Sequence, residues 1–353
     1  MAASTNSAVT LAGMVVFWYG SSMLSATTSK SLLLGVEGQR VNAFEMTLLQ
    51  MWISAGCACA LSVASHGGGV SQLRPKSSHA ALRTLSLGAV FAVAFVSLNL
   101  AYSLMSASLA NTLRALEPLS SLLLAALTTD ESVTDWRLLL SVAAIVTGAC
   151  LASYGNAEAT PLGLFYCTIA NFAFAYRTIQ YKAIRAEFSV DHATLFFQTC
   201  AVSGALLVPV LVALQPWREL LAQSWMVLHC TPEFFSTMMV NGVTFFLYLQ
   251  LSFATLSYIT VVTHSILNSF RRPAVIVFDV LIFRTKLSDV NAAGVTLACA
   301  GVTAFSMIKA HIAAQPASKA RQSPLAQDKP LLAPTAPPAS ASAPGSPKAD
   351  KYH

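Results

Sequence analysis

Two adjacent arginines, Arg271 and Arg272, interrupt an apolar stretch, VVTHSILNSFRRPAVIVFDVLIF, that is long enough to cross a lipid bilayer. An ionised side chain at bilayer depth costs at least about 2.5–3.5 kcal/mol, so such residues usually mark a functional site. Guanidinium groups remain charged at physiological pH, and their paired N–H donors match the oxygens of a phosphate group. The two arginines therefore predict a site for a phosphate-bearing anion inside the membrane.

Other polar residues follow the helical spacing of this arginine pair. His264, Asn268 and Arg271 lie at positions i, i+4 and i+7, which places them on one face of a helix. An earlier apolar segment carries a third arginine, Arg114, in a similar polar stripe. If the two stripes face each other, Arg114, Arg271 and Arg272 converge on a cavity near the middle of the bilayer.

A structural interpretation of the same charged residues stays open. Arg114 can pair with Glu117, three residues later on the same helix, and Arg272 can pair with a carboxylate elsewhere. Arg177 and Lys182 lie toward the end of their apolar segment, where snorkelling to the membrane interface is expected. Asp279 is interpreted as a carboxyl group satisfied by packing rather than as a proton relay.

The composition indicates an integral membrane protein. Of 353 residues, 55% are hydrophobic and 10% are charged, whereas a soluble domain has roughly a quarter of charged residues. The formal net charge is +6, but the basic residues are scattered, which argues against nucleic-acid binding. The sequence contains no HExxH or GxSxG motif, no metal-ligand spacing of its cysteines and no cofactor motif, so neither an enzyme nor a metal protein is expected.

Apolar runs of about 20 residues predict an all-α membrane protein with ten transmembrane helices. The first run starts too early and lacks the basic flank of a cleaved signal peptide. The transporter domain is expected at residues 8–310, after a short N-terminus at 1–7 and before a Pro/Ala/Ser-rich tail at 311–353 that is expected to be disordered. The predicted spans are 8–34, 42–65, 81–104, 106–129, 136–154, 161–186, 192–214, 233–256, 259–284 and 287–310.

Loop charges and a faint internal repeat predict the topology. Basic residues are more frequent in alternate loops and in the tail, which favours a cytosolic location for both termini. The segment NLAYSLMSASLANTLR resembles QLSFATLSYITVVTHS about 150 residues later. Two repeats of five helices have opposite orientations, an arrangement found in many secondary transporters.

The motifs around the arginines resemble those of the triose-phosphate/phosphate translocator family, within the drug/metabolite transporter superfamily. Its THSxxNxxKR pattern corresponds to THSILNSFRR here, and its KALEP signature corresponds to RALEP at Arg114–Pro118. The family's Trp-Tyr pair with a lysine twelve residues after the Trp corresponds to Trp18, Tyr19 and Lys30. The segment ANFAFAYRTIQYKA partly matches the family's sixth-helix pattern.

The resemblance implies an antiporter that exchanges a phosphorylated metabolite, such as a sugar phosphate, for inorganic phosphate or another phosphorylated compound. A nucleotide-sugar antiporter of the same fold is the alternative. In the family, the equivalents of Arg114, Arg271 and Arg272 bind the substrate phosphate, and the equivalent of Tyr248 contacts the rest of the substrate. The complete set of expected substrate-binding residues is Arg114, Tyr248, Arg271, Arg272, Lys30, His264 and Asn268.

The sequence also departs from the family pattern. Phe95 and Leu98 occupy the positions at which chloroplast members carry a histidine and a threonine or serine, which argues against the usual three-carbon substrates. Pro273 directly after the arginine pair is expected to kink its helix, because it removes the backbone bond to Ser269. No transit sequence precedes the first apolar run, which favours a Golgi or ER membrane over the plastid envelope. A monomer or a homodimer is expected.

Overall fold

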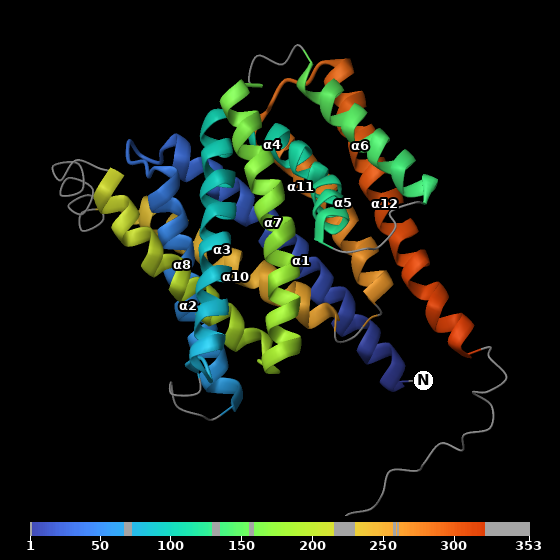
Figure 1. The fold of residues 1–353 in the computed structure, drawn as a ribbon. Coiled ribbons are helices and arrows are strands. Elements are labelled where there is room, and N and C mark those ends of the chain that lie inside the picture. Colours follow the sequence, from blue (N-terminus) through green and yellow to red (C-terminus); the bar gives the residue numbers. More distant parts are fainter. Residues whose placement is uncertain are drawn as a thin grey trace, which may run out of the picture. The chain divides into compact units, whose positions relative to one another are not determined.

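The regular elements in a computed structural model of the chain are helices (Figure 1). The structure describes residues 2–66, 73–128, 135–154, 159–214, 230–256, 259 and 261–321. Within these ranges there is no β-strand, and the β-type pairing is limited to one isolated bridge between Val36 and Gln39. The elements are α1 (Ala2–Leu34), α2 (Ala43–His66), α3 (Ser78–Leu104), α4 (Ala107–Leu113), the 3-10 turn η2 (Arg114–Leu116), α5 (Glu117–Thr128), α6 (Trp136–Ser153), α7 (Pro161–Phe188), α8 (His192–Leu214), α10 (Pro232–Leu256), α11 (Val261–Phe283) and α12 (Asp289–Arg321).

Helix occurs in each segment that was expected to span the membrane, and the all-helical membrane architecture is confirmed. Seven of the described helices are long and apolar enough to cross a bilayer: the apolar parts of α1, α2, α3, α6, α8, α10 and α12. Helices α7 and α11 carry the intramembrane charges, including Arg177 and the pair Arg271 and Arg272, which lowers their hydropathy. Charged side chains thus make these two expected spans less apolar.

Three expected helix spans differ from the structure by more than three residues. The first helix was expected to begin at residue 8, but α1 begins at Ala2. The fourth span was expected to be one helix over residues 106–129, but it consists of α4, the turn η2 and α5. The last helix was expected to end at residue 310, but α12 continues to Arg321. Residues Met1–His311 form one compact unit, and a second begins at Ile312; residues 322–353 of the expected tail lie outside the described part of the chain.

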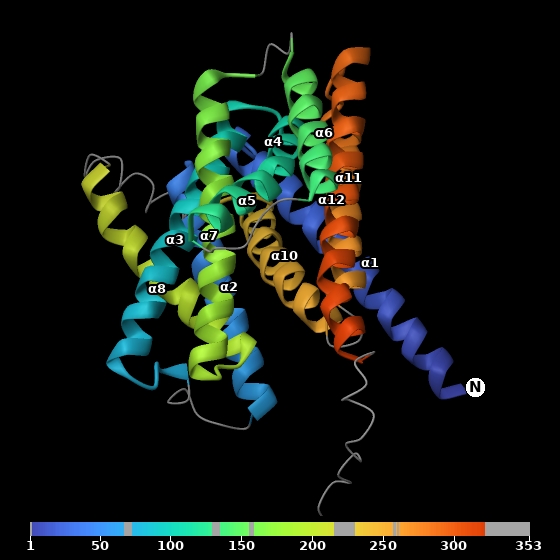
Figure 2. The ribbon, with the colours of Figure 1, turned by 45° about the vertical axis from the view of Figure 1, so that its right-hand side comes forward.

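The first unit is built from long helices that pack in pairs. Helix α3 lies along α7, α1 packs against α10, and α2 packs against α8 (Figures 1 and 2). Helix α3 also contacts α8, while α10 contacts α2. Helix α11 contacts α1 and α4, and α5 contacts α7. These contacts bring the broken span α4–α5 and the arginine-bearing helix α11 together.

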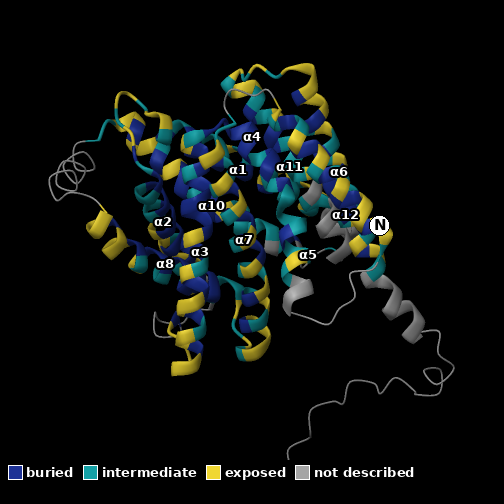
Figure 3. Cartoon of the chain, turned by 45° about the horizontal axis from the view of Figure 1, so that its top comes forward, coloured by how far each residue is buried: buried dark blue, intermediate teal, exposed yellow. Residues whose placement is uncertain are grey.

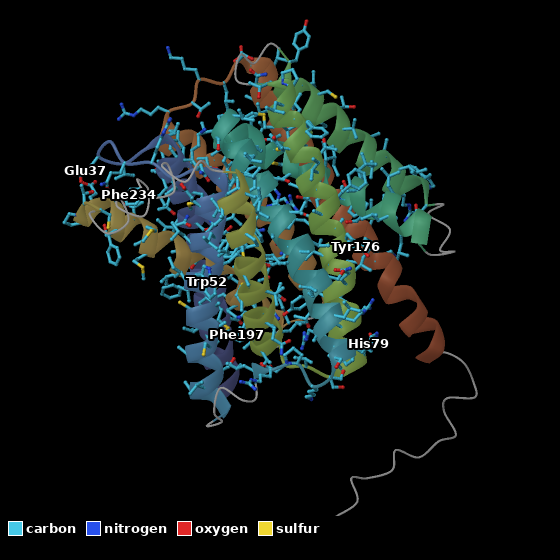
Figure 4. All side chains as sticks on the ribbon, turned by 60° about the vertical axis from the view of Figure 1, so that its left-hand side comes forward. Glu37, Trp52, His79, Tyr176, Phe197 and Phe234 are labelled. Carbon is cyan, nitrogen blue, oxygen red and sulfur yellow. The ribbon has the colours of Figure 1, made fainter. Side chains whose placement is uncertain are left out.

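Aromatic side chains form the centre of the largest core cluster. Phe95 of α3 packs edge-on against Phe174 of α7 and Phe245 of α10, with ring centroids 4.9 and 4.7 Å apart. Phe91 lies beside Phe95, and all four rings are buried, on helices whose inward faces are dark in Figure 3. A smaller cluster surrounds the fully buried Phe234, which is labelled in Figure 4.

A buried hydrogen-bond network joins four helices inside the apolar core. Gln50 of α2 donates to Ser29 of α1 and to Asn241 of α10, at 3.1 Å in each case. Asn99 of α3 donates to Gln50 Oε1 at 3.1 Å and to Thr47 Oγ1 at 2.9 Å. Polar side chains without water must find partners within the protein, so this network fixes the register of α1, α2, α3 and α10.

Helices α6 and α12 cross at glycines with their backbones in contact. A Cβ atom on Gly148 would lie 2.4 Å from the backbone nitrogen of Ala298, and one on Gly294 would lie 2.3 Å from that of Ala152. Small residues four apart on each helix allow this close approach. Asn291 of α12 closes the seam by donating to the carbonyl groups of Leu151, Ala152 and Tyr154 at the end of α6.

The glycine crossing gives a prediction about stability. Alanine favours a helix over glycine by about 1 kcal/mol, but at residue 148 its methyl group meets backbone atoms that cannot move aside. Gly148→Ala is therefore expected to destabilise the protein by about 1–3 kcal/mol, as overpacking does. Gly56→Ala on α2 is the control, because nothing lies within 4 Å of its added Cβ. In thermal unfolding in detergent, an unchanged midpoint for Gly148→Ala would contradict the described crossing.

Candidate anion-binding site

Pro118 creates an unsatisfied acceptor in the fourth span. Because proline has no N–H group, the carbonyl oxygen of Arg114 lacks its α-helical donor. The chain tightens into the turn η2, and this oxygen accepts a hydrogen bond from the N–H group of Glu117. It also accepts one from Nη1 of Arg272 on α11, at 2.5 Å. At the break in the fourth span, the carbonyl oxygen thus gains a donor from an arginine that lies far away in the sequence.

The same arginine forms an ion pair beside that carbonyl group. Nη2 of Arg272 lies 2.8 Å from Oε2 of Glu117, and Nη2 of Arg114 lies 3.1 Å from the same oxygen. The three side chains are 15–21% exposed. The pairing of Arg114 with Glu117 that the sequence left open is thus present, and one carboxylate serves two guanidinium groups.

Arg271 is surrounded by neutral groups. Its Nε donates to Oδ1 of Asn268 at 3.3 Å, and its Nη1 donates to the hydroxyl of Ser22 on α1. Its guanidinium carbon lies 5.7 Å from the ring centre of Tyr248 on α10. No carboxylate in the described ranges forms a salt bridge with Arg271. The spacing of Asn268 and Arg271 on one helical face is confirmed by their contact.

Lys30, an expected substrate-binding residue, bonds to backbone carbonyl groups. Its Nζ donates to the carbonyl oxygens of Tyr102 and Met105, at 2.5 and 2.7 Å, and the side chain is buried. These carbonyl groups belong to the end of α3, where a helix has acceptors without intrahelical donors. Lys30 therefore anchors α3 to α1. The side chain of His264 lies outside the described part of the structure.

The buried carboxyl group of Asp279 is satisfied by packing, as expected. Oδ1 accepts a hydrogen bond from Thr27 at 3.1 Å, and Oδ2 accepts one from Asn111 at 2.9 Å. Oδ1 of Asn111 in turn accepts from the hydroxyl of Tyr102 at 3.0 Å. This network joins α1, α3, α4 and α11 next to the ion pairs and holds the helices that carry them.

A fourth arginine, Arg177, faces the interior. It was expected to snorkel to the membrane interface, but its guanidinium carbon lies 5.1 Å from the ring centre of Phe174 and 5.4 Å from that of Phe91. Arg114 stacks on the same Phe174 ring at 4.0 Å. Neither a hydrogen bond nor a salt bridge links the guanidinium of Arg177 to another residue of the described ranges. The sequence feature that could have indicated this inward orientation is the (i, i+3) spacing of Phe174 and Arg177, which places both side chains on one face of the helix.

The α3 side of the site is apolar. Phe95 and Leu98, at the positions of the two missing polar residues, are 3% and 5% exposed. Phe95 packs into the aromatic cluster beneath Arg114 and Arg177. At these two positions, α3 therefore offers a ring face and an aliphatic side chain and no hydroxyl or imidazole group.

The charge balance of the site is positive. Of the four guanidinium groups of Arg114, Arg177, Arg271 and Arg272, those of Arg114 and Arg272 pair with Glu117, and the other two form no salt bridge with a carboxylate in the described ranges. The Nε of Arg114 is buried and has no hydrogen-bond partner within the described ranges. Charges desolvated in this way need a counter-ion. Since guanidinium groups bind phosphate and carboxylate oxygens in pairs, the arrangement is suited to an anion with several oxygens.

Comparison with known proteins identifies the family. A model of the Triose-phosphate Transporter family matches residues 9–306. The chain belongs to this family. Phosphoenolpyruvate/phosphate translocator 1, chloroplastic, is 32% identical over 242 residues in Oryza sativa subsp. japonica and 30% identical over 239 residues in Arabidopsis thaliana. Each alignment covers 67% of this chain and 58% of the relative.

Other relatives agree with this assignment. The triose phosphate/phosphate translocator, chloroplastic, of Flaveria trinervia is 27% identical over 251 residues, which are 69% of this chain and 60% of the relative. The chain thus spans about three fifths of the length of these relatives. A solved crystal structure with 15% identity covers 86% of this chain and 98% of its own, with a TM-score of 0.50, and so supports the fold. The relatives are translocators, and their chloroplast location does not support the expected Golgi or ER membrane.

The position of Arg177 gives a second prediction. Arg177→Gln removes a charge that has no carboxylate partner in the described structure, so an anion in the site loses a charge-assisted hydrogen bond worth about 1.5–3 kcal/mol. Stabilisation of the detergent-purified protein by inorganic phosphate should then require at least about tenfold more phosphate. Lys182→Gln, an exposed cation on the same helix, is the control. Equal phosphate dependence in both variants would place Arg177 outside the site.

Proposed function

We propose that this chain is a secondary antiporter that exchanges a phosphorylated metabolite for inorganic phosphate or for another phosphorylated compound. The observation that carries the proposal is a group of four arginines inside an apolar helical bundle, of which two pair with the carboxylate of Glu117 and two have no carboxylate partner in the described ranges. The similar translocators are named for a phosphorylated compound together with phosphate, which supports the proposal. No catalytic role is needed to explain these residues.

In the proposed site, Arg114, Arg271 and Arg272 bind the phosphate group and Tyr248 contacts the rest of the substrate. Asn268 acts by orienting the guanidinium of Arg271. Lys30 acts indirectly, because it holds the end of α3. His264, one helical turn before Asn268 on α11, stays a predicted substrate contact.

We also propose that the transport domain, residues 8–310, has ten membrane spans in two inverted repeats of five. The proposal relates α1 to α7, α2 to α8, α3 to α10 and the span α4–α5 to α11. Several helix contacts occur in the matching pairs that such a relation requires. The contact of α3 with α7 corresponds to that of α10 with α1, and the contact of α3 with α8 corresponds to that of α10 with α2.

The nucleotide-sugar alternative is less well supported by the site. That alternative requires one basic residue for the phosphates of the nucleotide, whereas four guanidinium groups are gathered here. The aromatic wall of Phe95 and Phe174 is already closed by ring-to-ring packing. The excess of positive charge favours a compact, strongly anionic substrate.

The same charges support coupled exchange. Alternating access passes through a state in which the site is sealed from water on both sides. With a phosphate dianion bound, most of the positive charge is offset; with the site empty, the guanidinium groups are desolvated without a counter-ion. Each 1.4 kcal/mol of this penalty lowers the population of the sealed empty state about tenfold. The empty carrier should therefore rarely reorient.

Coupling can be tested with the purified full chain in liposomes. Liposomes preloaded with inorganic phosphate should take up labelled phosphate or phosphorylated substrate at least tenfold faster than liposomes preloaded with a non-phosphorylated sugar. The external label is identical in both, so the difference reports the need for an internal anion. Comparable uptake into both kinds of liposome would contradict strict exchange.

Variants of the arginine pair test the site. Arg272→Ala should abolish uptake, because it removes a phosphate ligand and the partner of both Glu117 and the Arg114 carbonyl. Arg271→Lys should retain part of the uptake, since the charge remains but the paired donors do not. Lys286→Ala, an exposed cation after the end of α11, is the control. Wild-type uptake by Arg272→Ala would exclude the assigned site.

A further inference from the structure

A cavity lies away from the four arginines of the candidate site, in a groove between α6 and α12. Its volume is about 400 Å³. Trp136 and Arg137 line one end. The two helices run side by side in Figures 1 and 2. Apart from Ser141, whose hydroxyl donates to the Leu138 carbonyl, the rest of the lining is apolar and includes Leu140, Ala144, Leu297, Ala300, Ala304 and Ile308.

The groove exists because small residues alternate with large ones along a close helix crossing. Gly301 permits the close approach, since a Cβ there would lie 2.8 Å from Cγ1 of Ile145. Ala300 and Ala304 then leave room between the larger Leu297 and Ile308. The groove opens outward, because Leu140 on its edge is 62% exposed. An occupant would enter from the side that faces lipid.

The length of the groove matches one leaflet of a bilayer. From Leu297 to Ile308 the α12 axis rises about 16 Å, at 1.5 Å per residue. Half of the hydrocarbon thickness of a bilayer is about 15 Å. A single extended acyl chain from one leaflet would therefore fill the groove from end to end.

One end of the groove carries positive charge. Helices α6 and α12 are antiparallel, since Gly148 lies near Gly294 and Ser141 lies near Gly301; Lys309, next to Ile308, is thus at the same end as Arg137. Arg137 is exposed, its guanidinium carbon lies 5.9 Å from the Trp136 ring centre, and it makes no salt bridge with another described residue.

The surroundings of this end place it at the membrane interface. The nearby carboxylate of Asp135 accepts a hydrogen bond from the backbone nitrogen of Arg137 at 2.9 Å and caps α6. Trp136 is 66% exposed. Exposed tryptophan beside arginine and lysine is typical of the headgroup level of a membrane. An acyl chain in the groove would thus have its headgroup next to two cations.

We propose that this groove binds an anionic phospholipid, with one acyl chain between α6 and α12 and its headgroup phosphate against Arg137 and Lys309. The site is separate from the anion-binding site and does not depend on the transported substrate. A second copy of the chain is a poorer occupant. A symmetric dimer through this face would bring the cationic ends of both copies to one interface, where like charges repel.

Native mass spectrometry of the purified full chain tests the headgroup contact. Phosphatidylglycerol and phosphatidylcholine with identical acyl chains are titrated separately. Each basic residue near an anionic headgroup contributes a factor of roughly five in affinity. The variant with both Arg137→Gln and Lys309→Gln should therefore bind phosphatidylglycerol roughly 25-fold more weakly, with little change for phosphatidylcholine. Equal affinity of the wild-type chain for both lipids would overturn the proposal.

A matched pair of substitutions tests the acyl-chain position. Ala300→Leu fills the groove and should lower phosphatidylglycerol binding at least tenfold. Ala293→Leu is the control, because this alanine is also exposed and lies two turns earlier on the same face of α12, outside the groove. Both variants should elute as a single species in size-exclusion chromatography. Unchanged lipid binding by Ala300→Leu, or a protein dimer that only this variant loses, would refute lipid as the occupant.

Discussion

The guanidinium group of Arg272 donates to two acceptors in the fourth span, each of which has one further donor within that span. One is the carbonyl oxygen of Arg114, which Pro118 deprives of its helical donor, and the other is the carboxylate of Glu117. In an apolar bundle, each of these acceptors would cost free energy if it had no partner. The position of α11 relative to α4 and α5 is therefore fixed at the same point at which the substrate phosphate is expected. In the proposed site, helix packing and phosphate binding thus depend on the same side chain.

Polar groups in the described bundle fall into two classes by their contacts. Gln50, Asn99 and Asn241 bond to one another and to hydroxyl groups, and Asp279 accepts from Asn111 and Thr27. These groups have partners on neighbouring helices and stabilise the packing. The Nε of Arg114 and the guanidinium of Arg177 rest on the Phe174 ring instead. A stacked ring offsets part of the desolvation cost and leaves these N–H donors without a hydrogen-bond partner in the described ranges.

Much of the site could be predicted from the sequence, because its strongest signal is the rarity of charge in apolar segments. Arg114, Arg271 and Asn268 were found through helical spacing and family motifs, both of which are local. The inward direction of Arg177 was not predicted. An arginine near a helix end is equally compatible with snorkelling to the membrane interface and with stacking on an aromatic ring inside the bundle. The contact between Lys30 and the end of α3 joins residues 72 and 75 positions apart. No local pattern specifies such a contact.

The break in the fourth span could likewise not be predicted from local sequence patterns. RALEP is a recognisable motif, but its proline alone does not reveal whether the helix bends, ends or tightens. The outcome depends on Arg272, which offers a donor to the freed carbonyl group. The apolar runs predict where helix occurs, and the tertiary contacts decide where it is interrupted.

The glycine crossing of α6 and α12 has a kinematic consequence. Where backbone meets backbone, no flexible side chain lies between the helices to absorb a relative displacement. Sliding of one helix by a single residue would drive Cβ atoms into main-chain atoms. The two helices must therefore move together as one rigid body. Any rearrangement that opens the bundle has to occur at other helix interfaces.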